Sequence, residues 1–464
     1  MTSPTASAPR VSFLEKLAYG LGDTASNFVF HTVNLFLFYF YTDVVGLAPA
    51  AISTMFLVVR LWDAVNDPVM GVIADRTRSR WGKYRPYLLW VALPFGLITW
   101  LTFANPPLAG GGRLVYAYVT YNLLLMVYTA INVPYSALLG VMTPSSPERT
   151  VLSSYRFVCA FGGQFIIGFA ARPLVRVLGG GNEAAGWSAT MALLGAAAVV
   201  MFVFTFSITR ERVQPAAQQR PDLRRELGLL VRNPAWVVLA ISAVFTLANV
   251  AVRNGVTVHY FKYCIGDDGT RFFWFMDKTT LFFTSASIAL ILGVASTKWF
   301  SSRWDKRTLY IALSVANGAA IGLLFLVPAD NLPLLFAVNI IGTFFAGPTP
   351  ALVWSMFADV ADYGAWKFGH RTTALVFSAT QFAQKTGIML GGFVPGLVLD
   401  RVGFVANAVQ SPESIMGIRV MFTLLPAALA LTGALIIRLY PLNDKLVAQM
   451  ERDLAARSHG AAHG

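Results

Sequence analysis

RSRWGKYRPYLL (residues 78–89) and SSRWDKRTLYIA (residues 301–312) are two copies of one pattern within a chain of 464 residues. Arg80 and Lys83 of the first copy correspond to Arg303 and Lys306 of the second, at an offset of 223 residues. A shorter echo, ERT at 148–150 and HRT at 370–372, has an offset of 222. Two matches at nearly the same offset predict a chain built from two duplicated halves.

The composition is that of an integral membrane protein. Hydrophobic residues make up 56% of the chain and charged residues 13%, whereas soluble domains carry about 25% charged residues. A membrane-spanning helix needs about 20 apolar residues. Polar and Pro/Gly-rich breaks then delimit twelve predicted spans, near 19–41, 49–74, 86–104, 114–141, 153–177, 187–209, 234–260, 279–300, 308–328, 333–358, 373–399 and 416–440.

The spans and the repeat together predict an all-α fold of two pseudo-symmetric six-helix bundles. We expect the N-terminal bundle at 19–209 and the C-terminal bundle at 234–440. A cytoplasmic tail at 1–18 would precede them, a linker at 210–233 would join them, and a tail at 441–464 would follow. Residues 1–10 lack the apolar core of a signal peptide and are expected to be disordered.

Basic residues concentrate in alternate loops. The net charge is +13, and such loops remain in the cytoplasm. This distribution predicts a multi-pass protein of the bacterial inner (plasma) membrane with both termini in the cytoplasm, and it argues against a nucleic-acid partner. Cys159 and Cys264 fall in different halves and show neither a disulfide framework nor metal-ligand spacing.

Two carboxylates interrupt the second predicted span, in the stretch RLWDAVNDPVMG at 60–71. Asp63 and Asp67 are four residues apart and share one helix face. Charged groups in hydrocarbon are costly and mark ion pathways. Two such acids repel unless one is protonated or a cation lies between them, so the pair predicts a site for H⁺ or Na⁺. The alternative is a structural role, with the acids paired to Arg60 or capping a kink at Pro68.

Several stretches resemble the glycoside–pentoside–hexuronide:cation symporters, the melibiose-permease-like branch of the major facilitator superfamily. They are FYFYTDVVGL (38–47), RLWDAVNDPVMG (60–71), TRSRWGKYRPY (77–87), NVPYSAL (132–138), HYFKYCIG (259–266) and ADVADYGAWK (358–367). The resemblance implies the major facilitator fold, a central cavity, alternating access and cation-coupled (H⁺ or Na⁺) sugar symport. The implied partners are a small sugar, the coupling cation and the lipid bilayer. No cofactor is implied, and the only metal expected is a possible Na⁺ at Asp63 and Asp67.

The resemblance also supplies the rest of the cation site. Thr129 and Asn132 match the third and fourth cation-site positions of the family. The melibiose permeases have an aspartate where this chain has Asn132, and the loss of one carboxylate favours H⁺ over Na⁺.

Candidate sugar contacts come from polar residues inside spans and from matched positions. Asn27 replaces an aspartate that grips sugar hydroxyls in the melibiose permeases, and Asn132 is a further candidate. Asp23 has two readings: a ligand, or the partner of a basic group between helices. Arg156 matches the arginine that joins the sugar and cation sites; the alternative is an arginine that snorkels towards the cytoplasmic end of its helix. Lys385 matches the cavity lysine of the family, and Gln381 lies one turn earlier on the same face.

Aromatic and basic residues complete the set. Trp354 offers a ring for sugar stacking or for helix packing, and Tyr128 is a comparable candidate. Arg253 adds a base within span seven. Losing acids while keeping bases makes a cavity more tolerant of anions, so we expect a glycoside, pentoside or uronic-acid-type substrate. The alternative for Arg253 is pairing with Asp23 or Asp63.

Charged loop residues suggest a cytoplasmic gate. Opposite charges from both halves would form salt bridges there when the cavity faces outward. The alternative is that these charges only set the topology, and for the arginines both roles can hold together. The candidates are Asp75, Arg76, Arg80, Arg149, Arg303, Asp359, Asp362 and Arg371.

No motif of an enzyme competes with transport, since GxxxxGK[ST], HExxH and GxSxG are all absent from the sequence. The remaining alternatives are a carrier of lysolipids or other amphiphiles with the same fold, and a transport-inactive sugar sensor. We expect a monomer to be functional.

Overall fold

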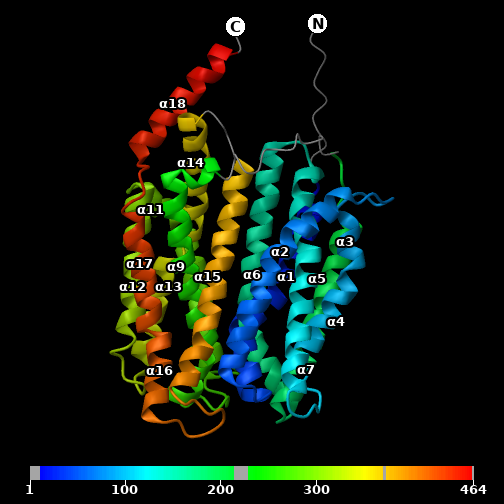
Figure 1. Ribbon diagram of the computed structural model, residues 1–464, viewed down its shortest axis with the longest axis vertical. Helices are drawn as coiled ribbons and strands as arrows, with labels where there is room; N and C mark the ends of the chain where they lie inside the picture. The colour runs from blue at the N-terminus through cyan, green and yellow to red at the C-terminus, as the bar shows by residue number, and fades with distance from the viewer. Residues whose placement is uncertain (1–10, 214–227, 369–372, 462–464) are drawn as a thin grey trace. The chain divides into compact units, whose positions relative to one another are not determined.

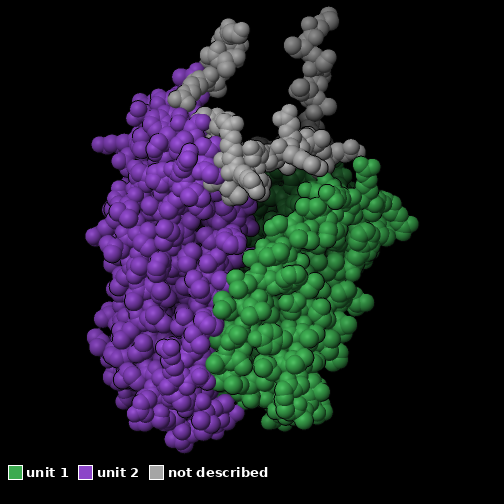
Figure 2. All heavy atoms as spheres, viewed as in Figure 1, with its two compact units in different colours: residues 1–218, 269–281 green, residues 219–268, 282–464 purple. Residues whose placement is uncertain are grey.

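The computed structural model describes residues 11–213, 228–368 and 373–461. Within these ranges the chain forms helices and two isolated β-bridges, but no strand (Figure 1). Contacts divide the chain into unit 1, Met1–Gln218 with Gly269–Leu281, and unit 2, Gln219–Asp268 with Phe282–Gly464 (Figure 2). The expected tail at 1–10 and the gate residue Arg371 lie outside the described residues.

Unit 1 holds the helices of the first six predicted spans. They are α1 (Phe13–Thr32), the π-helical η1 (Val33–Leu37) and η2 (Phe40–Val44), α2 (Pro49–Arg76), α3 (Arg85–Trp90), α4 (Ala92–Thr102), α5 (Gly112–Met142), α6 (Ser146–Gly179) and α7 (Glu183–Ile208). Several starts follow the usual chemistry of helix ends. Ser12 and Asn182 accept hydrogen bonds from the main-chain N–H groups of Glu15 and Ala185.

Unit 2 holds the helices of the last six spans, apart from the first residues of α10. They are α9 (Pro234–His259), η3 (Tyr260–Cys264), α10 (Lys278–Ala295), α11 (Thr297–Ser301), α12 (Lys306–Leu323), α13 (Leu332–Ala346), α14 (Thr349–Phe368), α15 (Thr373–Arg401), α16 (Pro412–Phe422), α17 (Leu424–Ile437) and α18 (Asp444–Ala461). Buried Leu309, Met356, Phe357 and Tyr440 belong to a core that joins α12, α14 and the end of α17.

Each of the twelve predicted spans coincides with a helix or a run of helices. Eight of these are long and apolar enough to cross a membrane by length and composition alone. The remaining four are the α1–η2 run, α2, the α3–α4 pair and α12. Polar residues lower the hydropathy of α1 and α2, and these are the same residues that the sequence analysis selected for function. The helix α4 is apolar but only 11 residues long.

The duplication is visible at the ends of the first helix of each half. Phe40–Val44 and Tyr260–Cys264 are both π-helical, and each is followed by a glycine with positive φ, Gly46 at +78° and Gly266 at +70°. The same two hydrogen bonds close both turns: Val45 N to Phe40 O matches Ile265 N to Tyr260 O, and Leu47 N to Tyr41 O matches Asp267 N to Phe261 O. π-Helical turns are rare, so their recurrence at matching places supports the two pseudo-symmetric halves.

Close contact between α1 and α6 fixes the polar face of α1. A Cβ atom at Gly163 would lie 3.2 Å from Asn27 Cβ, and one at Gly20 would lie 2.7 Å from Cys159 Sγ. Small residues allow such close approach of membrane helices. The Thr24 hydroxyl donates to the carbonyl of Cys159 at 2.9 Å, which adds a polar tie at the same crossing.

Candidate functional site

The two carboxylates of α2 lie opposite its exposed apolar face. The large apolar residues of that face are each about half exposed: Leu61, Trp62, Val65, Val69 and Val72. Helical periodicity places Asp63 and Asp67 on the other side of the helix, and both are half-buried. Pro68 lies within α2 and removes the N–H that would bond to the carbonyl of Ala64. The helix is therefore weakest beside the acid pair.

Thr129 of α5 joins the two acids. Its hydroxyl lies 3.0 Å from Asp63 Oδ1 and 2.9 Å from Asp67 Oδ1, and Thr129 is 2% exposed. A hydroxyl has one proton to donate, so it satisfies one ionised carboxylate at a time. The second contact needs a proton on the other carboxyl group, which then donates to the Thr129 oxygen, or else a cation.

Asn132 is one turn beyond Thr129 on α5, and its hydrogen bonds run to α1 and within α5. Its Oδ1 accepts from the Ser26 hydroxyl at 2.7 Å, and its Nδ2 donates to the Tyr128 carbonyl at 3.0 Å. The structure thus brings Thr129 to both carboxylates but links Asn132 to the helix that carries the candidate sugar contacts. Arg60 Nη2 donates a hydrogen bond to Asn34 Oδ1 of η1 at 3.4 Å.

Asp23 and Arg156 form a bidentate ion pair between α1 and α6. The Nε–Oδ2 distance is 2.6 Å and the Nη2–Oδ1 distance is 3.3 Å. Tyr135 of α5 lies 3.0 Å from Asp23 Oδ2 and also hydrogen-bonds to the carbonyl of Tyr19. Its ring centre is 4.8 Å from the Arg156 guanidinium. Of the two readings of Asp23, the structure shows the pairing with a basic group between helices.

Asn27 lies one turn after Asp23 on α1. Its Nδ2 donates to the Asp23 carbonyl at 2.8 Å, and its Oδ1 accepts from Gln164 Nε2 at 3.1 Å. Tyr128 stacks on Phe30 with ring centres 5.5 Å apart.

The candidate residues of unit 2 lie on α9, α14 and α15. Arg253 Nη2 donates to Asn339 Oδ1 of α13 at 2.7 Å. On α15, Gln381 is exposed and Lys385 is half-buried. Trp354 stacks on Phe377 with ring centres 5.7 Å apart and planes at 12°. One face of the Trp354 ring is thus covered by Phe377 of α15.

Four of the expected gate residues contact partners within their own units: Asp75, Arg80, Arg303 and Asp359. Asp75 accepts from Tyr84 at 2.7 Å and lies 3.2 Å from Lys83 Nζ. Asp359 lies 2.7 Å from Lys306 Nζ. Arg80 and Arg303 rest on the rings of the tryptophans Trp81 and Trp299 at 4.3 and 4.0 Å. Arg149 and Asp362 lie near the start of α6 and near the end of α14.

Glu211, which the sequence analysis left unassigned in the linker, binds the start of α3. Its carboxylate accepts from the main-chain N–H groups of Lys83, Tyr84 and Arg85 at 2.7–3.0 Å. Gly82 is at φ +111°, and a Cβ atom there would lie 2.5 Å from the carboxylate carbon of Glu211. In the sequence, Gly82 alone hints at this contact, because no residue near it indicates that Glu211, more than a hundred residues later, supplies the acceptor.

Glu15 anchors the same linker to α1. It is 3% exposed and accepts from both terminal nitrogens of Arg212 at 2.7 Å. The hydrogen-bonded Glu15 carboxylate raises the pKa of Arg212. The first residues after α7 are thereby fixed to α1 and to the start of α3.

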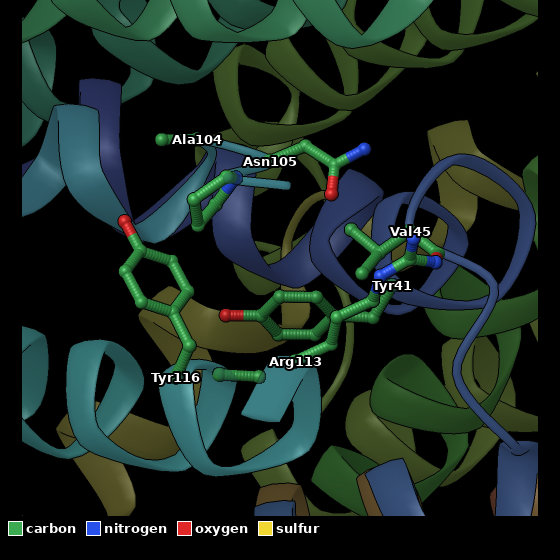
Figure 3. A pocket seen from close by; sticks show the side chains of 8 residues that line it. Tyr41, Val45, Ala104, Asn105, Arg113 and Tyr116 are labelled. Atoms are coloured by element: carbon green, nitrogen blue, oxygen red, sulfur yellow. The ribbon is translucent and has the colours of Figure 1, made fainter. Parts of the chain in front are cut away.

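A pocket of unit 1 lies beside the end of η2 and the α4–α5 connection (Figure 3). Tyr41, Asn105, Arg113 and Tyr116 line it together with small apolar residues. Arg113 already donates to the carbonyls of Val45 and Leu108, and Tyr116 donates to that of Leu101. These polar groups serve the backbone around them, and none of the predicted cation or sugar residues lines this pocket.

Comparisons with known proteins agree along nearly the whole chain. The model of the MFS/sugar transport protein family matches residues 18–444. A putative glycoside/cation symporter of Escherichia coli is 38% identical, over 98% of this chain and 97% of its own length. A glucuronide carrier protein homologue of the same organism is 32% identical, over 94% of each chain.

The inward-open structure of the Escherichia coli xylose transporter has the same fold, with a TM-score of 0.62 at 12% identity. It covers 94% of this chain and 98% of that one. The chain belongs to the MFS/sugar transport protein family and is a multi-pass membrane protein that carries a sugar together with a cation.

Proposed function

We propose that this symporter is driven by protons, and that Asp63 and Asp67 share the proton through Thr129. The observation that carries the proposal is the single Thr129 hydroxyl within 3.0 Å of both carboxylates. One proton on the pair lets the three groups form a continuous chain of two hydrogen bonds. Without it, the single Thr129 proton cannot serve both carboxylates, and the repulsion between two negative charges opposes the compact arrangement.

Asn132 supports protons over Na⁺. Hard cations need several oxygen ligands, and a carboxylate at this position would supply one. The Asn132 amide oxygen is instead used by Ser26 at 2.7 Å. The absence of a carboxylate at Asn132 therefore favours a proton over Na⁺.

The test is sugar-driven alkalinisation of the medium, measured against Na⁺-dependent uptake in proteoliposomes. The wild type is expected to take up protons with sugar and to show no dependence on Na⁺. Asp63→Asn and Asp67→Asn should abolish proton uptake while sugar exchange across the membrane continues. Sugar uptake that requires Na⁺ and moves no protons would refute the proposal.

The proposed cargo is a glycoside, pentoside or uronic-acid-type sugar. A matched relative is named for glycosides and another for glucuronides. In this chain Asn27 and the Asp23–Arg156 pair lie on the polar side of α1, and Gln381 and Lys385 lie within α15. Exposed amides inside a membrane span are stable where they face water or a polar cavity, which supports Gln381 as a sugar contact.

We further propose that the protein works as a monomer in the inner membrane, with both termini in the cytoplasm. The loops rich in Arg and Lys support this topology. Asp359 and Asp362 serve the cytoplasmic gate together with Asp75, Arg76, Arg80, Arg149, Arg303 and Arg371. Exposed ion pairs are worth about 0–1 kcal/mol, which suits contacts that break in every cycle. Charge reversal at Asp359 should shift cysteine accessibility towards the inward-open state, and unchanged labelling would refute its role.

A further inference from the structure

Arg253, which is half-buried, and the buried Asn339 form a polar pair between α9 and α13 whose hydrogen-bonding capacity is only partly used. Arg253 Nη2 donates to Asn339 Oδ1 at 2.7 Å. Asn339 is 2% exposed, and its Nδ2 has no acceptor. Arg253 Nε is likewise buried without an acceptor. Buried donors that lack a partner destabilise the fold, so a pair of them points to a missing acceptor.

The charge of Arg253 lacks a counterion among the described residues. Arg156 and Arg172 of unit 1 each contact a carboxylate, at 2.6 and 2.7 Å. Arg253 instead lies over the rings of Phe422 and Phe282, at 4.9 and 5.6 Å from their centres. Cation–π contacts return only part of the free energy that removing an ion from water costs. The environment is therefore apolar, positively charged and short of acceptors.

The position of Arg253 makes snorkelling difficult. It lies eleven residues before the end of η3, which corresponds to about 16 Å along a helix. The hydrocarbon core of a bilayer is about 30 Å thick, so the guanidinium lies near its middle. Basic residues at this depth pair with an acidic residue or a backbone carbonyl, or they mark a substrate pathway.

We propose that Arg253 and Asn339 bind the carboxylate of an acidic sugar and thereby set the specificity of the carrier. A carboxylate is acceptor-only and planar. It matches the planar guanidinium fork, whose parallel N–H groups favour bidentate contact. Its oxygens supply the acceptors that Nε and Asn339 Nδ2 lack. Phe282 and Phe422 exclude water and strengthen the attraction. This inference rests on the proposed sugar cargo and names one chemical class within it.

The experiment measures equilibrium binding of a matched pair of probes, 4-nitrophenyl β-D-glucuronide and 4-nitrophenyl β-D-glucoside, to the purified full-length protein. The two differ in a carboxylate against a hydroxymethyl group. The wild type should bind the glucuronide at least about 10-fold more tightly, and Arg253→Gln should weaken glucuronide binding by about 100-fold while changing glucoside binding less than about threefold. Arg253→Lys keeps the charge without the fork and should lose about 10-fold.

Asn339→Ala should also weaken the glucuronide selectively. The matched control is Arg419→Gln, since Arg419 belongs to the same unit but donates to the Phe325 carbonyl at 2.9 Å. This control should leave both probes unaffected. Equal binding of the two probes by the wild type, no binding of the glucuronide, or an equal loss of both in Arg253→Gln would overturn the inference. Binding is measured without a proton gradient, so a failure of proton coupling would leave this result standing.

Discussion

Asp305 and Gly82 occupy matching positions in the two halves, and a carboxylate accepts hydrogen bonds from the helix start at both. Asp305 supplies its own carboxylate, whereas Glu211 supplies the one beside Gly82. Asp305 and Gly82 occupy the same place in the repeated Arg-Trp-x-Lys pattern. Asp305 accepts from Thr308 N at 3.1 Å and caps α12. At Gly82 the carboxylate of Glu211 fills the space where a Cβ atom would lie. One requirement, an acceptor at the start of the third helix of each half, is met locally in one copy and from the linker in the other.

Removal of the Glu211 carboxylate is expected to destabilise unit 1. Glu211→Ala leaves three N–H groups of residues 83–85 without their acceptor, and each unsatisfied buried donor costs about 1–3 kcal/mol. The measurement is the Tm of the detergent-solubilised protein. Glu413→Ala is the matched control, because Glu413 is exposed in the first turn of α16. An equal Tm for the Glu211 and Glu413 variants would contradict this role.

Thr129→Val is expected to uncouple the carrier. It removes the hydroxyl that lies between Asp63 and Asp67 but keeps the shape of the side chain, so the two carboxyl groups lose their shared donor. Sugar accumulation against a gradient should fall to a ratio of about 1 while exchange continues, because only differential binding of the ion drives accumulation. Thr129→Ser keeps the hydroxyl and serves as the control. Full accumulation by Thr129→Val would rule out a role in proton coupling.

The Asp23–Arg156 pair should show strong energetic coupling. Either single change, Asp23→Asn or Arg156→Gln, leaves a partly buried charge without its partner, while the double change removes both charges. We expect a coupling energy of about 1–3 kcal/mol in a double-mutant cycle on the unfolding free energy. Additive effects would show that the two charges act independently. Sugar exchange measured on the same variants separates a loss of transport from a loss of folding.

Asp277 should make stability depend on acid pH. Burial alone would raise the pKa of Asp277, but Arg172 at 2.7 Å and hydrogen bonds from Thr280 lower it below the ordinary value of 3.8. A depressed pKa in the folded state stabilises the fold above the unfolded value, and this stabilisation is lost as the pH falls through the folded pKa.

The check is the Tm of wild type and Asp277→Asn between pH 7 and pH 3. Asparagine can still cap α10 but cannot pair with Arg172 as a charge. The Tm difference between the two proteins should be large at pH 7 and shrink below about pH 4. Glu413→Gln is the control, since Glu413 is exposed in the first turn of α16. A constant difference across this range would contradict the assignment.

The sequence predicted the fold well because membrane spans are a one-dimensional signal. All twelve spans coincide with helices, and the acid pair of α2 could be placed on one face from its spacing alone. Contacts between distant helices were less accessible. Thr129 entered through a resemblance, Tyr135 was not among the candidates, and the ion pair of Asp23 with Arg156 was one of two alternatives. Glu211 was hidden because its partners are backbone N–H groups, which carry no residue signature.

The contacts of α5 recur at intervals of three residues. Thr129 contacts α2, whereas Asn132 and Tyr135 contact α1. α5 thus contacts both neighbouring helices through three residues that lie within two turns of one another. Loss of the Thr129 contact when a proton departs would therefore also shift the contacts that α5 makes with Ser26 and Asp23. Movement of one helix would then couple release of the ion to release of the cargo.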